Sequence, residues 1–232
     1  MAVFRQLFDP ESSTYTYLLG EAGEAVLIDP VREQAGRDLA LLARLGLRLV
    51  WSLDTHVHAD HVTAAALLQA RTGCATAVGQ RAGVACADRL LAEGDEIRFG
   101  GEVIRVLETP GHTAGCVSYL WRDRLFTGDA LLIGGCGRTD FQDGDPGTLY
   151  DSIVGKLFTL PDETLVYPAH DYEGRRVSCI GQEKAINPRL AGRSREAFVA
   201  LMESMAFPLP RRIQVAVPAN RRCGREGIGG GA

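Results

Sequence analysis

Apolar and polar residues are arranged along the first third of the chain in a pattern that predicts strands followed by helices. Short apolar runs bounded by Gly, Asp and Pro predict strands at residues 3–8, 15–19, 25–28 and 48–53. Leu and Ala recur at helical spacing between and after these runs, which predicts one helix that stops at Gly46 and another that ends near Gly73. The two closely spaced strands near the start of the chain favour antiparallel pairing.

The second half of the chain repeats this plan. It contains predicted strands at residues 97–99, 103–107, 117–121, 125–127 and 165–167, and predicted helices at 148–158 and 196–205. Because each sheet must cover an apolar face, the pattern indicates an α/β fold with two facing mixed sheets and helices outside. We expect a single domain over residues 1–232, with a metal-binding core to about residue 172, a C-terminal extension of 173–226 and a Gly-rich tail, 227–232, that frays.

The composition narrows the class of protein and its partners. The 232 residues are 46% hydrophobic and 23% charged, enough for one sizeable core, and the net charge of −4 argues against a nucleic-acid partner. No apolar stretch approaches the ~20 residues of a membrane span, and the first ten residues lack a signal-peptide core, so we expect a cytoplasmic protein without a membrane partner. The six cysteines show no paired spacing, which predicts reduced, mostly buried thiols and no disulfide framework.

The candidate chemistry lies in the histidines, which occupy only three places in the sequence. They are His56, His58 and His61 in the segment THVHADH, His112 in TPGHTAG and His170 in YPAHDY, with Asp60 beside the first group. Three imidazoles and a carboxylate within six residues are a donor set that transition metals prefer. Each place follows a predicted strand, and so does Asp129. Since strands commonly present functional loops at one edge of a sheet, we expect these side chains to converge on a metal.

These segments resemble a known set of metal-binding motifs. THVHADH at 55–61, GHT at 111–113, GD at 128–129 and PAH at 168–170 are similar in order and spacing to the motifs of the metallo-β-lactamase fold. The resemblance implies an αββα sandwich with the metal at its edge. Further segments resemble the persulfide dioxygenase (sulfur dioxygenase) branch of that superfamily, namely GCGRTDFQ at 135–142, LYDSI at 149–153, HDY at 170–172, NPRL at 187–190 and PAN at 218–220.

The ligand residues alone leave the metal and the reaction open. A dinuclear zinc site, as in the related glyoxalase II hydrolases, would cleave S-acylglutathione thioesters and would use His56, His58 and His112 for one ion, Asp60, His61 and His170 for the other, and Asp129 between them. A mononuclear site would hold one Fe(II) through His56, His112 and Asp129, with open positions for dioxygen and a substrate sulfur. The dioxygenase resemblance implies the second arrangement, in which His58, Asp60, His61 and His170 orient ligands and waters by hydrogen bonds. A non-catalytic metal-binding protein is a third alternative.

The resemblance further implies a reaction and a substrate. One Fe(II) per chain would oxidise glutathione persulfide with O2 and water to sulfite and glutathione. Because glutathione carries two carboxylates, Arg138 is expected either to bind one of them or to pin its Gly-rich loop through Asp140. Tyr172 is the candidate to place a hydroxyl near the substrate sulfur, and Arg222 is a weaker candidate for a carboxylate. Cys136 offers the rival hypothesis of a covalently carried persulfide, and a homodimer is the default expectation for the assembly.

Overall fold

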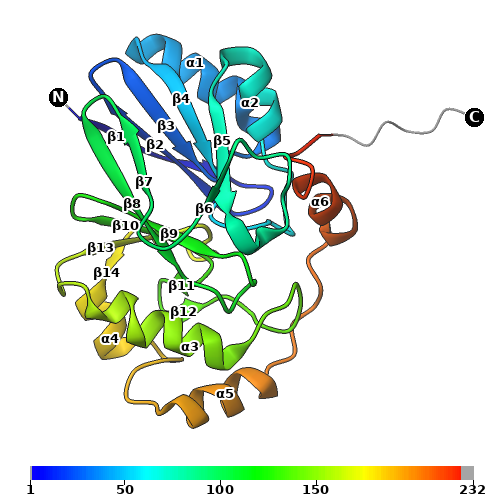
Figure 1. Cartoon of the computed structure of the whole chain (residues 1–232). Coiled ribbons are helices and arrows are strands. Elements are labelled where there is room, and N and C mark those ends of the chain that lie inside the picture. Colours follow the sequence, from blue (N-terminus) through cyan, green and yellow to red (C-terminus); the bar gives the residue numbers. More distant parts are fainter. Residues whose placement is uncertain (1, 226–232) are drawn as a thin grey trace, which may run out of the picture.

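The computed structural model describes residues 2–225 and contains two six-stranded sheets that face each other (Figure 1). The first sheet has the order β1 (Val3–Asp9), β2 (Thr14–Glu21), β3 (Glu24–Ile28), β4 (Arg48–Leu53), β5 (Ala75–Gly79) and β6 (Arg89–Leu91). Its β1, β2 and β3 pair antiparallel, whereas β3 to β6 pair parallel. The first sheet is therefore mixed, with the antiparallel start that the sequence predicted.

The second sheet is also mixed. Its order is β14 (Ser178–Cys179), β13 (Leu165–Pro168), β10 (Arg124–Gly128), β9 (Val117–Trp121), β8 (Glu102–Glu108) and β7 (Glu96–Phe99). Only β10 and β13 pair parallel among these strands. A small two-stranded sheet of β11 (Leu131–Leu132) and β12 (Gly135–Cys136) lies beside it.

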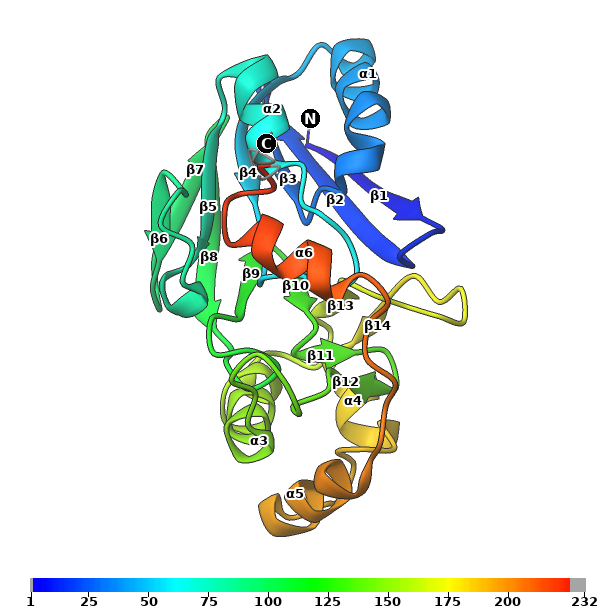
Figure 2. The same cartoon turned by 90° about the vertical axis from the view of Figure 1, so that its right-hand side faces the viewer.

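Helices cover the outer faces of both sheets (Figure 1). The first sheet carries α1 (Ala35–Leu45) and α2 (Ala65–Thr72), and the second carries α3 (Pro146–Gly155), α4 (Ile180–Ile186) and α5 (Arg195–Ser204). The chain then runs back along the side of the molecule to α6 (Ile213–Asn220), far from α5 (Figure 2). Three short 3-10 helices complete the list, η1 (Arg32–Gln34), η2 (Gln80–Ala82) and η3 (Leu157–Thr159). This αββα arrangement confirms the predicted fold class.

Strand periodicity explains how the layers pack. In β2, the fully buried Leu18 joins the cluster under α1 and α2, whereas its neighbours Tyr17 and Leu19 point into the core between the sheets. Phe126 of β10 meets Tyr17 across that core with ring centroids 4.8 Å apart. Large side chains thus pack the two sheets against each other. The loops at their common edge are connected to this well-packed core.

Several elements differ from the sequence expectations. The pattern did not predict β5, β6, β11, β12, β14, α4 or α6. The expectation that all cysteines are reduced thiols is wrong, because Cys86 and Cys223 form a disulfide across 137 residues of sequence. The other four cysteines are free, as expected. The predicted Gly-rich tail, 227–232, lies outside the described residues. Among the residues that are described, no helix combines the length and apolarity needed to cross a membrane.

Candidate metal centre

Four loops at the ends of strands bring the predicted metal residues together. The histidine loop, defined as residues 54–63, follows β4, while His112 follows β8, Asp129 follows β10 and His170 follows β13. The nearest donor atoms of His56, His112 and Asp129 all lie within 4.8 Å of one another. A second group with the same spacing contains His58, Asp60 and His61. The five histidines are buried, and neighbouring rings lie with their centroids 4.0–6.3 Å apart, so the structure brings them together at this edge.

His112 is held with one ring nitrogen directed at Asp129. Its Nδ1 atom lies 2.7 Å from the carbonyl oxygen of Arg138, and because a carbonyl only accepts, Nδ1 carries the proton and donates. The other nitrogen, Nε2, then has a lone pair and lies 3.6 Å from Oδ2 of Asp129. Burial lowers the pKa of the His112 imidazole, which favours the neutral form that can bind a metal.

Asp129 is oriented by His170, which in turn is oriented by Asp60. The Nδ1 atom of His170 donates to Oδ1 of Asp129 at 2.7 Å, and its Nε2 donates to Oδ2 of Asp60 at 3.0 Å. Burial alone would lower the pKa of His170, but the two carboxylates raise it well above its usual value. Although burial opposes this, the charged His170 lowers the pKa of Asp129. Asp129 thus stays ionised, with Oδ2 left to face the site.

Two buried ring nitrogens have no hydrogen-bond partner among the described residues, Nδ1 of His58 and Nε2 of His61. The opposite nitrogen of each ring is engaged, since His58 Nε2 lies 3.1 Å from Asp29 and His61 Nδ1 lies 2.8 Å from Asp60. Burial acts to lower the pKa of His58, but Asp29 raises it to about 9. A buried polar atom without a partner is costly, so these two nitrogens are candidates to contact a ligand or a water of the site.

Asp29 and Gly137 are site residues that the sequence analysis missed. Asp29 accepts from the backbone N–H of Thr55 at 2.7 Å and from its hydroxyl at 2.9 Å, so it anchors the start of the histidine loop. Gly137 packs so tightly that a Cβ atom there would lie 2.3 Å from the Asp129 carbonyl oxygen and 2.8 Å from the His112 ring. The only signals were an Asp directly after a strand and a Gly within the GCGRTDFQ segment.

Two of the predicted substrate residues, Arg138 and Tyr172, contact histidines of this centre. Arg138 forms a two-pronged ion pair with Asp140, with both N···O distances at 2.6 Å, and also donates to the carbonyl oxygen of Pro208 at 2.7 Å. These contacts hold the loop of Arg138 in place. Tyr172 is 75% exposed and stacks parallel to His170, with ring centroids 6.1 Å apart. Arg222 is exposed and lies just after α6.

The thiol of Cys136 is unsuited to carry a persulfide. Its side chain is 2% exposed, and burial raises the pKa of the thiol to about 11 although Arg189 opposes the shift. A reactive cysteine needs access and a lowered pKa, and Cys136 has neither. Cys136 instead packs with the core of α3, α4 and α5.

Comparisons with known proteins agree with this geometry. The family model described as the metallo-beta-lactamase superfamily matches residues 9–170. The mouse protein named "Persulfide dioxygenase ETHE1, mitochondrial" is 51% identical over 227 residues, which covers 96% of this chain and 89% of the mouse protein. The crystal structure of ETHE1 from Myxococcus xanthus superposes with a TM-score of 0.95 at 56% identity and covers 96% of this chain and 100% of that chain. A hydroxyacylglutathione hydrolase from Anaeromyxobacter dehalogenans is 41% identical, but over only 68% of this chain and 61% of the hydrolase.

Proposed function

The chain belongs to the metallo-beta-lactamase superfamily and, within it, to the persulfide dioxygenases, and on that basis we propose that it oxidises glutathione persulfide at a single Fe(II). The reaction takes up O2 and water and releases sulfite and glutathione. The single observation that carries the iron proposal is the group of His56, His112 and Asp129, because two imidazoles and one carboxylate on one face are the donor set of non-haem Fe(II) oxygenases.

The three residues fit this ion because each presents a donor of the right kind. His112 offers the Nε2 lone pair, since its Nδ1 proton is held by the Arg138 carbonyl, and Asp129 offers Oδ2, since Oδ1 accepts from His170. Three protein ligands would leave open positions for a sulfur and for dioxygen. When bound, Fe(II) supplies the redox chemistry that joins oxygen to the terminal sulfur.

The remaining residues of the site support its shape and exclude water. Asp60 accepts from His170, His61 and the hydroxyl of Thr14, so one carboxylate oxygen organises three side chains. Asp60 thereby fixes the ring of His170, and His170 fixes the carboxylate of Asp129. Because the site is almost fully buried, the persulfide sulfur would enter a region with little bulk water.

Both ring nitrogens of His170 are engaged by carboxylates, and this supports one metal per chain. A dinuclear zinc site would take one of these nitrogens as a ligand. The dinuclear hydrolase nevertheless stays the second candidate, because His58 and His61 have unpartnered nitrogens, and the dinuclear arrangement would use His58 for one ion and His61 for the other. The two arrangements differ in metal count and in the substrate that is consumed.

The substrate-binding proposal places glutathione at the exposed rim. We propose that Tyr172, whose ring stacks on His170, places its hydroxyl near the substrate sulfur, and that Arg138 and Arg222 bind the two carboxylates of glutathione. We further propose one domain for the chain, a cytoplasmic location and a homodimer. The name of the mouse relative includes the word mitochondrial, so the location proposed here differs from the one in that name.

Oxygen uptake tests the proposed reaction. Protein purified without air is mixed with glutathione persulfide, and dioxygen, sulfite and glutathione are followed together. Dioxygen loss that equals sulfite release mole for mole supports the proposal. Cleavage of S-lactoylglutathione without oxygen uptake would replace it with the hydrolase alternative.

A further inference from the structure

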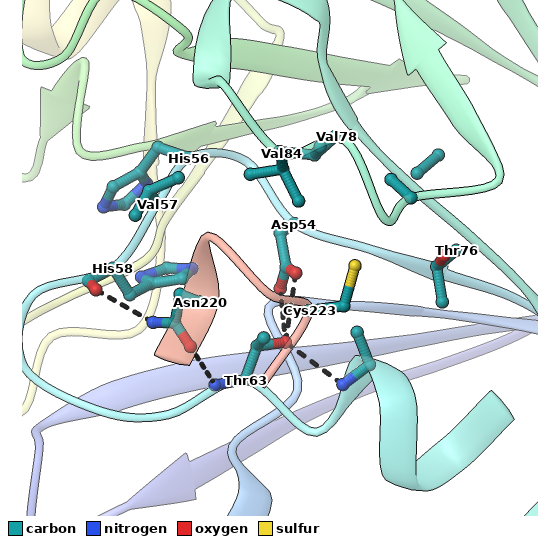
Figure 3. A pocket seen from close by; sticks show the side chains of 13 residues that line it. Asp54, His56, Val57, His58, Thr63, Thr76, Val78, Val84, Asn220 and Cys223 are labelled. Carbon is teal, nitrogen blue, oxygen red and sulfur yellow. Dashed lines mark hydrogen bonds between the residues drawn. The ribbon is translucent and has the colours of Figure 1, made fainter. Parts of the chain in front are cut away.

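The C-terminal end of α6 is attached to the back of the histidine loop. The amide nitrogen of Asn220 donates to the carbonyl oxygen of His58 at 2.9 Å, and its amide oxygen accepts from the backbone N–H of Thr63 at 2.9 Å (Figure 3). The same amide nitrogen also donates to the carbonyl oxygen of His61 at 2.8 Å. Asn220 is 4% exposed. One buried side chain thus satisfies three backbone groups of the loop that carries His56.

Residues 220–224, which we name the C-terminal clamp, make further contacts in the same place. The carbonyl oxygen of Cys223 accepts from the N–H of Ala66 at 3.0 Å, and that of Gly224 accepts from Arg32 at 2.8 Å. Gly224 has a positive φ, and a Cβ atom there would lie 2.1 Å from the carbonyl oxygen of Thr63. The clamp therefore lies in direct contact with the end of the histidine loop.

A disulfide ties this clamp to a different part of the fold. Cys223 bonds to Cys86, which lies between η2 and β6 at the edge of the first sheet. Cys223 is 4% exposed, whereas Cys86 is partly accessible. The bond is the sole disulfide within residues 2–225, and Cys223 lies three residues after Asn220 in the sequence. The covalent link and the hydrogen bonds of Asn220 thus act on the same short turn.

We propose that the Cys86–Cys223 pair is a redox-responsive site, and that its oxidised form locks the C-terminal clamp on the histidine loop and so slows metal release. Its reaction partner is a low-molecular-weight thiol. Since glutathione is the thiol that the proposed reaction releases, the choice of this thiol rests on the proposed function. A disulfide in a reducing compartment is characteristically transient and redox-sensing, which fits the cytoplasmic location proposed above.

The chemical step is a two-electron thiol–disulfide exchange. A thiolate attacks Sγ of Cys86, the more accessible sulfur, to form a mixed disulfide, and Cys223 leaves as a thiolate that takes a proton from water. A second thiolate attacks the outer sulfur of the mixed disulfide and releases Cys86 as a thiol. The protein disulfide is reduced by two electrons, and two small thiols are oxidised to one small disulfide.

After the disulfide is reduced, only noncovalent contacts hold the C-terminal clamp on the histidine loop. The preceding segment, residues 205–212, contains no helix or strand, so α6 is otherwise connected to α5 by an extended strip of chain. Hydrogen bonds at such an element open locally more often when a covalent constraint is removed. The groups that lose protection first should be those facing Asn220, above all the N–H of Thr63.

The test compares oxidised and reduced forms of the same purified holoprotein. Oxidised glutathione closes the disulfide, excess reduced glutathione opens it, and alkylation after denaturation should count four free thiols in the first case and two more in the second. We expect reduction to speed hydrogen exchange in the peptide of residues 54–63 and metal release to a chelator, each by about tenfold. Equal rates in the two forms, or the same thiol count in both, would overturn the proposal.

Three variants separate the effect of the disulfide from the effect of the Asn220 hydrogen bonds. Cys86→Ser should match the reduced wild type in both redox buffers, whereas the control Cys179→Ser, a free cysteine in β14, should still respond to glutathione. Asn220→Ala should speed exchange in the histidine loop while the disulfide stays intact by thiol count. If Asn220→Ala leaves the exchange unchanged, the clamp does not act through Asn220 and the proposal is wrong. None of these measurements uses persulfide turnover, so a failed oxygen-uptake assay is distinguishable from a failed clamp.

Discussion

The Nδ1–H group of His112 donates to the carbonyl oxygen of Arg138 at 2.7 Å, and this bond joins the metal centre to the loop that forms its rim. The same Arg138 pairs with Asp140 through its guanidinium group. One residue therefore sets the orientation of a proposed ligand through its backbone and the shape of the rim through its side chain. Changes in this loop should affect metal binding and substrate binding separately.

Removing His112 should remove the metal. The substitution His112→Ala deletes the Nε2 donor that faces Asp129, and two of the three proposed ligands cannot hold Fe(II) firmly. We expect metal content to fall to less than about a tenth of the wild-type value and oxygen uptake to fall with it. Elemental analysis checks this result, with the exposed Asp151→Asn as a control that should keep its metal. Full metal content in the His112 variant would show that the ligand set is wrong.

A methyl group at position 137 should displace residues of the same metal centre. The Cβ of Gly137→Ala would lie 2.3 Å from the Asp129 carbonyl oxygen and 2.8 Å from the His112 ring, so both must move. We expect a loss of about 1–3 kcal/mol in the free energy of unfolding, as for other overpacked sites, together with weaker metal binding. Urea unfolding and chelator competition measure the two effects.

The matched control is Gly155→Ala, because an added Cβ in α3 would meet no atom within 4 Å. Alanine is the better helix former by about 0.5–1 kcal/mol, so this variant should be as stable as the wild type or more stable. Similar losses in both variants would mean that the packing of Gly137 against His112 is not the cause.

Arg138→Ala tests whether the guanidinium binds substrate or only holds its loop. If the cation contacts a glutathione carboxylate, the KM for glutathione persulfide should rise by about tenfold with a smaller change in kcat. The companion variant Asp140→Asn weakens the ion pair that holds the loop but keeps the Arg138 guanidinium. We expect the KM of this variant to change by less than about threefold. Steady-state kinetics decide between them, since an equal rise in both variants would limit Arg138 to holding the loop.

Glu183 should matter for stability more than any exposed acid. It is 1% exposed and accepts from the backbone N–H of Gly134 at 2.9 Å, from the amide of Asn187 at 2.8 Å and from the hydroxyl of Ser178. Glu183→Ala leaves these buried donors without a partner, so the free energy of unfolding should fall by at least about 2 kcal/mol. The exposed Glu163→Ala should change it by less than about 0.5 kcal/mol in the same urea titration. Equal stability of the two variants would contradict this account of α4.

Local chemistry explains which parts of the fold could be predicted from sequence. The end of α1 at Gly46 was predictable because helices commonly end at a residue in the left-handed backbone conformation, which glycine adopts most easily. Gly46 has this conformation, with φ of 64°. The histidine loop was predictable because its donors are adjacent in sequence. In contrast, β5 (ATAVG) consists of small residues without a strong apolar pattern, and α6 contains Pro218 after a Pro-rich segment.

Long-range partners account for the rest of what was missed. Nothing near Asn220 in the sequence indicates that its side chain reaches His58 and His61, which lie about 160 residues earlier. The Cys86–Cys223 pair likewise has no spacing signal, because the two positions meet only once α6 has packed on the histidine loop. The sequence therefore indicated the donors of the metal centre but not the C-terminal contacts that hold them.

Metal stoichiometry and identity, measured together with oxygen uptake on anaerobically purified protein, test the central proposal most directly. The proposed ligands His56, His112 and Asp129 predict one iron per chain and oxygen consumption only when glutathione persulfide is present. Two zinc ions per chain, with S-lactoylglutathione cleaved and no oxygen consumed, would contradict it.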